Sequence, residues 1–199
     1  MKTLKTKYLL YSGIAIPIIF WSTTIICSVI MGNYNHLTRM VSELGELGTK
    51  TQFLFTLGLT LCGILTIPFV MGLYKATKSV GLNPVPILII LFYTTITGPA
   101  IFPYPLQLHG ILGMPSILII LSPILSIILW KGQRPLLNFK LISITSFIIM
   151  MLGFSVYMND FLGEFLGLKQ RFFHLGWSVW FIYLSYSFIQ LIHVNEVKS

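Results

Sequence analysis

The chain has 199 residues and a formal net charge of +8; 55% of its residues are hydrophobic and 9% are charged. An ordinary soluble domain carries about 25% charged residues and needs a largely polar exterior. The composition therefore excludes a water-soluble globular protein and predicts that lipid surrounds most of the surface.

Long apolar runs define the predicted elements. A bilayer core about 30 Å thick needs about 20 helical residues to cross it, and six apolar runs near that length carry no Lys, Arg, Asp or Glu. They are Tyr8–Met31, Phe53–Leu73, Val85–Phe102, Gly110–Trp130, Leu141–Met158 and Phe172–Val194. The first run is longer than the apolar part of a signal peptide and lacks a cleavage site after it, so we expect a retained span. Because helices satisfy their backbone hydrogen bonds internally, we predict an all-α integral membrane protein, one six-helix domain over residues 1–199.

The segment between the first two runs has the pattern of a short amphipathic helix. Its apolar residues recur at positions i, i+3, i+4 and i+7. They are Leu37, Met40, Val41 and Leu44. Asn35 is a typical N-cap, and Gly45 is a typical residue at the end of a helix. We expect this helix to lie along the membrane interface in the first outer loop and to cover the end of the bundle.

Basic residues are distributed unevenly over the loops. If the N-terminus is cytoplasmic, nine lysines and arginines lie on the inner side and four on the outer side, which accounts for all 13. The outer four are Arg39, Lys50, Lys169 and Arg171. Because cytoplasmic loops are enriched in basic residues, we predict that both termini are cytoplasmic. No basic cluster alternates with exposed aromatic residues, so we do not expect nucleic acid as a partner.

Acidic residues and histidines gather on the predicted outer side, which holds four of the five acidic residues and three of the four histidines. The candidates for acid–base catalysis are Glu43, His109 and Asp160. A Ser-His-Asp arrangement that uses Ser42 or Ser178 stays open, although no Gly-x-Ser-x-Gly elbow is present. His-x-x-x-His spacing is absent, so we predict no metal site and no cofactor.

The last run carries a polar stripe. Arg171, His174 and Ser178 fall on one side of a helix with 3.6 residues per turn, and Ser185 continues the stripe. Polar residues at membrane depth face either a neighbouring helix or a wet cavity. The stripe is therefore either a packing seam or the wall of a pocket. The predicted ligand-binding residues are Ser42, Arg171, His174 and Ser178.

Three short motifs occur in order on the six apolar runs: Ser42-Glu43-Leu44-Gly45, Phe102-Pro103 followed by Leu108-His109-Gly110, and Gly167-Leu168-Lys169-Gln170-Arg171. Together they resemble the small prokaryotic membrane proteins called domain of unknown function 998. The resemblance implies six helices in a bacterial inner membrane, or the cytoplasmic membrane of another prokaryote, with no established activity. It maps the family's recurring positions onto Ser42, Glu43, Gly45, His109 and Arg171. The chain departs from the usual pattern at Glu46 and Tyr104.

These observations predict a polar site at the outer face that acts on a lipid-like or amphiphilic molecule. Arg171 would suit a phosphate group on such a molecule. One alternative is a structural or accessory subunit that binds another membrane protein. A small transporter is disfavoured, because the inner halves of the runs are largely apolar. Whether the protein is an enzyme stays open at this stage.

Overall fold

The computed structural model describes residues 2–131, 136–158 and 160–198, and within them the side chains of residues 5–193. Every regular element in these ranges is helical, which confirms the predicted all-α class. The α-helices are α1 (Lys2–Met31), α2 (Gln52–Ser79), α3 (Val85–Leu88), α4 (Thr97–Ile101), α5 (Gln107–Gly113), α6 (Leu121–Leu129), α7 (Phe139–Gly153) and α8 (Leu166–Lys198). The 3-10 helices are η1 (Val41–Gly45), η2 (Ile89–Ile96), η3 (Met114–Ile120) and η4 (Phe154–Tyr157).

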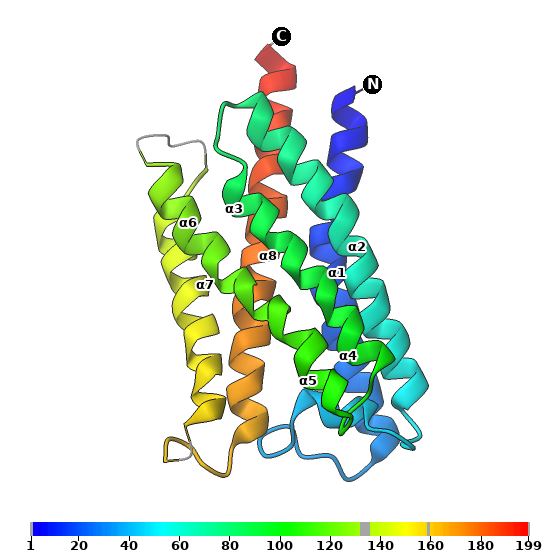
Figure 1. Ribbon diagram of the computed structural model, residues 1–199. Helices are drawn as coiled ribbons and strands as arrows, with labels where there is room; N and C mark the ends of the chain where they lie inside the picture. The colour runs from blue at the N-terminus through cyan, green and yellow to red at the C-terminus, as the bar shows by residue number, and fades with distance from the viewer. Residues whose placement is uncertain (1, 132–135, 159, 199) are drawn as a thin grey trace.

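The long helices run side by side, and both termini lie at the same end of the bundle (Figure 1). We call this the terminal end; the opposite loop end carries the loops after α1, α4 and η4. Five helical stretches of the described chain are long and apolar enough to cross a membrane, which makes this a multi-pass membrane protein by length and composition. They are Lys5–Met31, Gln52–Ser79, Gln107–Leu129, Phe139–Tyr157 and Leu166–His193.

The third predicted span is shorter than these five stretches. Its apolar helix covers Val85–Ile101 and runs from the terminal end to the loop end (Figure 1). The middle of this segment is the 3-10 helix η2, in which the Thr94 and Thr95 hydroxyls each donate to the carbonyl oxygen three residues earlier, at 2.8 Å. A 3-10 helix rises about 2.0 Å per residue against about 1.5 Å for an α-helix. The segment is therefore longer in space than its residue count implies.

The last helix begins earlier than predicted, at Leu166 instead of Phe172. The added turn contains two cationic side chains whose charged groups bind backbone carbonyl oxygens. Lys169 is fully buried and its Nζ donates to Met158 O at 2.8 Å. Arg171 Nη1 donates to Gly167 O at 2.9 Å. The predicted span is defined as a run without charged residues. This criterion excludes Lys169 and Arg171, although both lie inside the helix.

The loop after α1 lacks the continuous amphipathic helix that the sequence predicts. Residues 36–39 form a turn, and only Val41–Gly45 is helical, as η1. The carbonyl oxygens of Leu37 and Arg39 accept hydrogen bonds from α8 instead of from a helix of their own: Leu168 N–H donates to Leu37 O at 2.9 Å, and Arg171 Nη1 donates to Arg39 O at 3.0 Å. Docking onto α8 therefore replaces the predicted helical hydrogen bonds.

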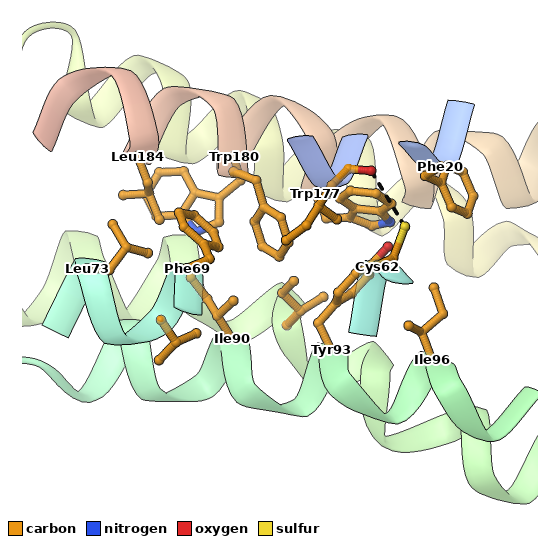
Figure 2. Close-up of a cluster of buried hydrophobic side chains, with 14 of the residues drawn as sticks. Phe20, Cys62, Phe69, Leu73, Ile90, Tyr93, Ile96, Trp177, Trp180 and Leu184 are labelled. Atoms are coloured by element: carbon orange, nitrogen blue, oxygen red, sulfur yellow. Dashed lines mark hydrogen bonds between the residues drawn. The ribbon is translucent and has the colours of Figure 1, made fainter. Parts of the chain in front are cut away.

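Aromatic side chains of α8 form the centre of the bundle. Trp177, Trp180 and Phe181 are fully buried and face Phe69 of α2 and Tyr93 of η2 (Figure 2). Trp180 Nε1 donates to Ser122 Oγ of α6 at 2.8 Å, so its one polar atom is satisfied inside the bundle. This packing holds η2 against α8 and so positions the loop end of both elements.

Helices α7 and α8 approach closely at Gly176. A Cβ at this position would lie 2.7 Å from Met150 N and 2.9 Å from Ser146 O, which no real side chain tolerates. Small residues allow such close contact between membrane helices, where van der Waals packing drives association. The contact fixes α7, and the η4 segment that follows it, against the first turns of α8.

Candidate functional site

A cavity of about 390 Å³ lies at the loop end of the bundle. Its wall is formed by parts of α1, η1, α2, η2, α4, α5, η3, α7, η4 and α8, together with the loop residues Met40 and Tyr104. Small-molecule sites have volumes of about 300–1,000 Å³ and are mostly apolar, with a few polar groups that fix the ligand. The cavity has the size and the composition of such a site.

Eight polar side chains line the cavity, and none of the described lining residues is charged. The eight are Ser42, Tyr93, Tyr104, His109, Ser116, Tyr157, Gln170 and His174. An isolated charge placed in an apolar cavity loses its hydration without compensation. The cavity therefore disfavours a charged group inside it.

The structure separates the residues predicted from the sequence into two groups. Ser42, His109 and His174 line the cavity. Glu43, Asp160, Arg171 and Ser178 do not line it. The predicted convergence of Glu43, His109, Asp160 and Arg171 on one pocket is thus not observed: only His109 of those four reaches it.

His109 lies in α5, directly after the turn that contains Pro103 and Pro105. Its Nδ1 donates to Phe102 O at 3.0 Å, and since a carbonyl oxygen only accepts, the neutral ring carries its proton on Nδ1. The Pro99 carbonyl oxygen is a second hydrogen-bonding neighbour of the His109 ring. No N–H or O–H of the described chain donates to Nε2. His109 therefore presents a lone pair to the cavity.

His174 and Gln170 reach the cavity from α8. Trp177 Nε1 donates to His174 Nδ1 at 3.1 Å, and the indole nitrogen is only a donor, so the His174 proton lies on Nε2. Val41 N–H donates to Gln170 Oε1 at 2.6 Å, which leaves the Gln170 amino group for another partner. Both side chains therefore present N–H donors, the opposite of His109.

Ser42 enters the cavity wall from η1, between two apolar residues whose side chains, Val41 and Leu44, pack in the core. The Ser42 hydroxyl has no hydrogen-bond partner among the described residues, and it is not enclosed. Ser42 is half-buried because one side of it faces the cavity. A larger side chain at this position would occupy cavity volume.

Glu43 and Asp160 lie outside the cavity. Glu43 Oε2 pairs with Arg39 Nε at 2.7 Å, and Glu43 Oε1 accepts from Met40 N–H at 2.7 Å, so this carboxylate closes the start of η1. The hydrogen bond and charge of Glu43 raise the pKa of Arg39. Asp160 is exposed, with no hydrogen-bond or ion-pair partner within the described ranges. Neither carboxylate is placed to act on a molecule in the cavity.

Arg171 is the centre of a separate polar cluster that we call the Arg171 cluster, made of Tyr34, His36, Arg39, Gly167 and Arg171. Nη1 donates to Arg39 O at 3.0 Å and to Gly167 O at 2.9 Å. Nη2 donates to the Tyr34 hydroxyl at 2.9 Å and to His36 Nδ1 at 3.0 Å. Four contacts from Nη1 and Nη2 tie the loop after α1 to the start of α8. Arg171 Nε is buried and has no hydrogen-bond partner among the described residues, and Arg171 does not line the cavity.

His36 extends the Arg171 cluster to α1. Because Arg171 donates to Nδ1, the His36 proton lies on Nε2, which donates to Ser28 Oγ at 2.9 Å. Burial lowers the pKa of His36, and the charge of Arg171 lowers it further. Burial raises the pKa of Tyr34 despite the nearby guanidinium. The neutral forms of both residues are therefore part of the folded structure.

Ser178 belongs to the contact between α1 and α8. Its Oγ accepts from Trp21 Nε1 at 3.0 Å and donates to His174 O at 2.6 Å. The polar stripe on the last helix is thus divided: Arg171 and Ser178 make structural contacts, whereas His174, between them, lines the cavity. The stripe is therefore a packing seam at Ser178 and the wall of a cavity at His174.

Gln170, Tyr93 and the Arg171 partners Tyr34 and His36 were not among the predicted site residues. Gln170 could have been found, because it lies four residues before His174 and therefore on the same face of a helix. Tyr93 lies in an apolar run with nothing in the sequence to distinguish it. Tyr34 is 137 residues from Arg171 along the chain, and no local pattern links the two.

No group of three or more His, Cys, Asp or Glu side chains close enough to hold a metal ion occurs in the described residues. Residues 14–187 match the family described as protein of unknown function (DUF998). The chain belongs to this family. No curated protein and no solved structure matches it. The family assignment confirms the resemblance seen in the sequence motifs and adds no activity, so the function must be argued from the DUF998 cavity itself.

Proposed function

We propose that this DUF998 protein binds a neutral, largely apolar amphiphile of the lipid class in the cavity at its loop end. The observation that carries the proposal is a cavity of about 390 Å³ with no charged lining residue among those described, lined by His109 and His174, whose rings are each hydrogen-bonded to the protein through Nδ1. Apolar walls favour a hydrocarbon body, and the ring nitrogens suit a small polar group.

Binding is favoured over catalysis at this site. The two predicted acids, Glu43 and Asp160, lie outside the cavity, and Glu43 is already paired with Arg39. Arg171, which the sequence made a candidate for a phosphate group, donates its hydrogen bonds to the protein. A phosphate headgroup would therefore find no cation in the cavity, which supports a neutral ligand.

We infer that the cavity faces the outer side of a prokaryotic cytoplasmic membrane and that the chain crosses this membrane six times. The common end of the two termini supports an even number of crossings (Figure 1). With η2 in 3-10 geometry, the 17 residues of Val85–Ile101 extend over about 30 Å, the thickness of the hydrocarbon core. The loop after α1 and η1 then lie at the outer interface.

The contacts of the basic residues support this orientation in addition to their uneven distribution. Of the four on the loop end, Lys169 and Arg171 bind backbone carbonyl oxygens, and Arg39 is paired with Glu43. Only Lys50 is left without a structural role in the described chain. Three of these four residues thus have structural reasons to lie at the loop end, while the other nine of the 13 basic residues follow the cytoplasmic preference.

The test compares the lipids that copurify with three proteins: the wild type, Ser42→Phe and Ser22→Phe. Phe at position 42 fills part of the cavity, whereas Ser22 is exposed on α1 outside it, so Ser22→Phe makes the same chemical change away from the site. Mass spectrometry of extracts from gently purified protein measures retained molecules per protein.

We expect the wild type and Ser22→Phe to retain the same neutral amphiphile and Ser42→Phe to lose it. Equal retention by all three folded proteins would contradict the proposal. Reporter fusions at each terminus and in the loop after α1 test the orientation independently. A periplasmic terminus would refute the outer position of the cavity.

A further inference from the structure

Gln170 and His174 lie one helical turn apart on α8, and both line the cavity. Residues four positions apart on an α-helix share a face, with about 5–6 Å between their Cβ atoms. The two side chains are therefore neighbours in the cavity wall, close enough to contact one atom of a ligand.

Each of the two side chains uses its acceptor atom on a protein N–H. Gln170 Oε1 accepts from Val41 N–H, and His174 Nδ1 accepts from the Trp177 indole. The remaining Nε2 atom of each side chain is a donor, has no partner in the described part of the chain and is not enclosed. Val41 N–H and the Trp177 indole can only donate, so the atoms that they contact must be the acceptors. Gln170 and His174 therefore each present an N–H group to the cavity.

We propose that Gln170 and His174 together bind a neutral carbonyl oxygen, so that the ligand is a long-chain ester, ketone or amide. A carbonyl oxygen has two lone pairs and no proton, which matches two adjacent donors. This assignment rests on the proposed function of the cavity, which it makes more specific. His109 lies on another wall and presents a lone pair, so it does not contribute to this donor pair.

The surroundings agree with a polar atom at this depth. Tyr93 lines the same cavity, its hydroxyl is fully buried, and this hydroxyl has no hydrogen-bond partner within the described residues. The Tyr93 ring packs against the Trp177 ring (Figure 2), with 4.6 Å between their centroids. Trp177 is the residue that donates to His174 Nδ1. Tyr93 and His174 therefore both contact Trp177, in a part of the core where one buried hydroxyl lacks a partner, which is uncommon in proteins.

The experiment uses the full chain in detergent and two probes of equal length: a long-chain methyl ketone with a terminal bromine, and the matched bromoalkane. Bromine quenches the fluorescence of nearby tryptophans such as Trp177, which gives the affinity of each probe. The infrared stretching frequency of the ketone carbonyl reports its hydrogen bonds directly. Ser42→Phe supplies the level of quenching that does not depend on the cavity.

The decisive variant is Gln170→Glu at about pH 10, which is high enough to ionise a carboxyl whose pKa is raised by burial in an apolar cavity. It keeps an oxygen for Val41 N–H but replaces the N–H donors with a charge that repels a carbonyl oxygen. Gln107→Glu makes the same change at an exposed position of α5 and is the control. His174→Phe removes the second donor and keeps a ring against Phe20, whose centroid lies 4.5 Å from that of His174.

We expect the wild type and Gln107→Glu to bind the ketone with a lowered carbonyl frequency. Gln170→Glu and His174→Phe should weaken ketone binding by about tenfold or more and leave bromoalkane binding within about twofold. Equal affinity for ketone and bromoalkane in the wild type, with an unshifted carbonyl frequency, would overturn the carbonyl assignment while the cavity's binding function stands. Quenching of the wild type no greater than that of Ser42→Phe with both probes would overturn both.

Discussion

The Arg171 cluster and the cavity both lie at the loop end of the bundle and both contain polar residues of α8, yet they differ in how their hydrogen bonds are used. In the Arg171 cluster, protein atoms accept from both terminal nitrogens of the guanidinium, and His36 is bonded at both ring nitrogens. In the cavity, the rings of His109 and His174 are each hydrogen-bonded to the protein through Nδ1. Arg171 Nε is buried without a partner among the described residues, so the Arg171 cluster is not fully saturated either. The difference is that the terminal nitrogens of Arg171 and both ring nitrogens of His36 bind other protein atoms, whereas each cavity histidine has one ring nitrogen outside these hydrogen bonds.

Arg171→Met should have the largest effect on stability. The substitution removes the donor to His36 Nδ1, to the Tyr34 hydroxyl and to Gly167 O, whereas Arg39 O still accepts from the Tyr34 hydroxyl. Each buried group left unpaired costs about 1–3 kcal/mol. We expect the free energy of unfolding to fall by at least about 3 kcal/mol, measured by thermal unfolding in detergent. Arg39→Met is the matched control: its side chain is partly exposed in a single ion pair, worth less than about 1 kcal/mol. Equal losses in the two variants would contradict a structural role specific to Arg171.

Gly167→Ala should have the next largest effect. A Cβ at Gly167 would lie 2.6 Å from His36 O and would also clash with Arg39 O, both of them backbone atoms of the docked loop. Overpacking of this kind costs about 1–3 kcal/mol, and we expect the loop to become accessible to protease. Gly110→Ala is the control, because its Cβ would meet nothing within 4 Å. A fully protected loop and unchanged unfolding temperature in Gly167→Ala would show that the loop does not dock on α8 as described.

His36 should make stability depend on pH. Its pKa in the folded protein is lower than the ordinary value of 6.5, so the folded state binds fewer protons than the unfolded state in the window just below that value. The stabilisation is complete above pH 6.5 and is lost as pH falls through the lowered pKa. His36→Asn, whose Oδ1 can accept from Arg171, should flatten this part of the pH profile in thermal unfolding. Identical pH profiles for the two proteins would remove His36 from the cluster.

Asp160→Asn and Glu43→Gln should have the smallest effects. Asp160 is exposed, and Gln at position 43 keeps an oxygen for Met40 N–H while removing only the ion pair with Arg39. We expect both variants to retain as much copurified lipid as the wild type, with stability changes below about 1 kcal/mol. Loss of the lipid in either variant, at normal stability, would show that the carboxylate takes part in ligand binding. The distinction between the cavity and its polar surroundings would then fail.

The sequence predicted the helices well, because crossing a bilayer imposes a length and an apolar composition that leave little choice. It also identified three cavity residues, Ser42, His109 and His174. It could not assign Arg171 to a structural cluster, because the partners Tyr34 and His36 become neighbours only when the loop after α1 folds onto α8. The sequence alone does not tell whether the N–H groups of an arginine bind other protein atoms in the fold or stay available for a ligand.

The same limit applies to the loop after α1. Its apolar spacing predicts a helix from residue 35 to 45, and local patterns contain no information on the carbonyl groups of Leu37 and Arg39 that α8 binds. The 3-10 geometry of η2 was equally hidden, because Thr94 and Thr95 bond within their own segment in a way that composition does not specify. The missing loop helix results from contacts with a segment distant in sequence. The 3-10 geometry of η2 results from local hydrogen bonding that the spacing of apolar residues does not reveal.

The central claim is that unsaturated polar atoms in the cavity mark a ligand site. An experimental structure of the protein in lipid nanodiscs tests it most directly. The account predicts elongated density inside the cavity, with its polar end within hydrogen-bonding distance of His174 Nε2 and Gln170 Nε2. A collapsed cavity, or one in which other protein side chains satisfy those two atoms, would contradict the account.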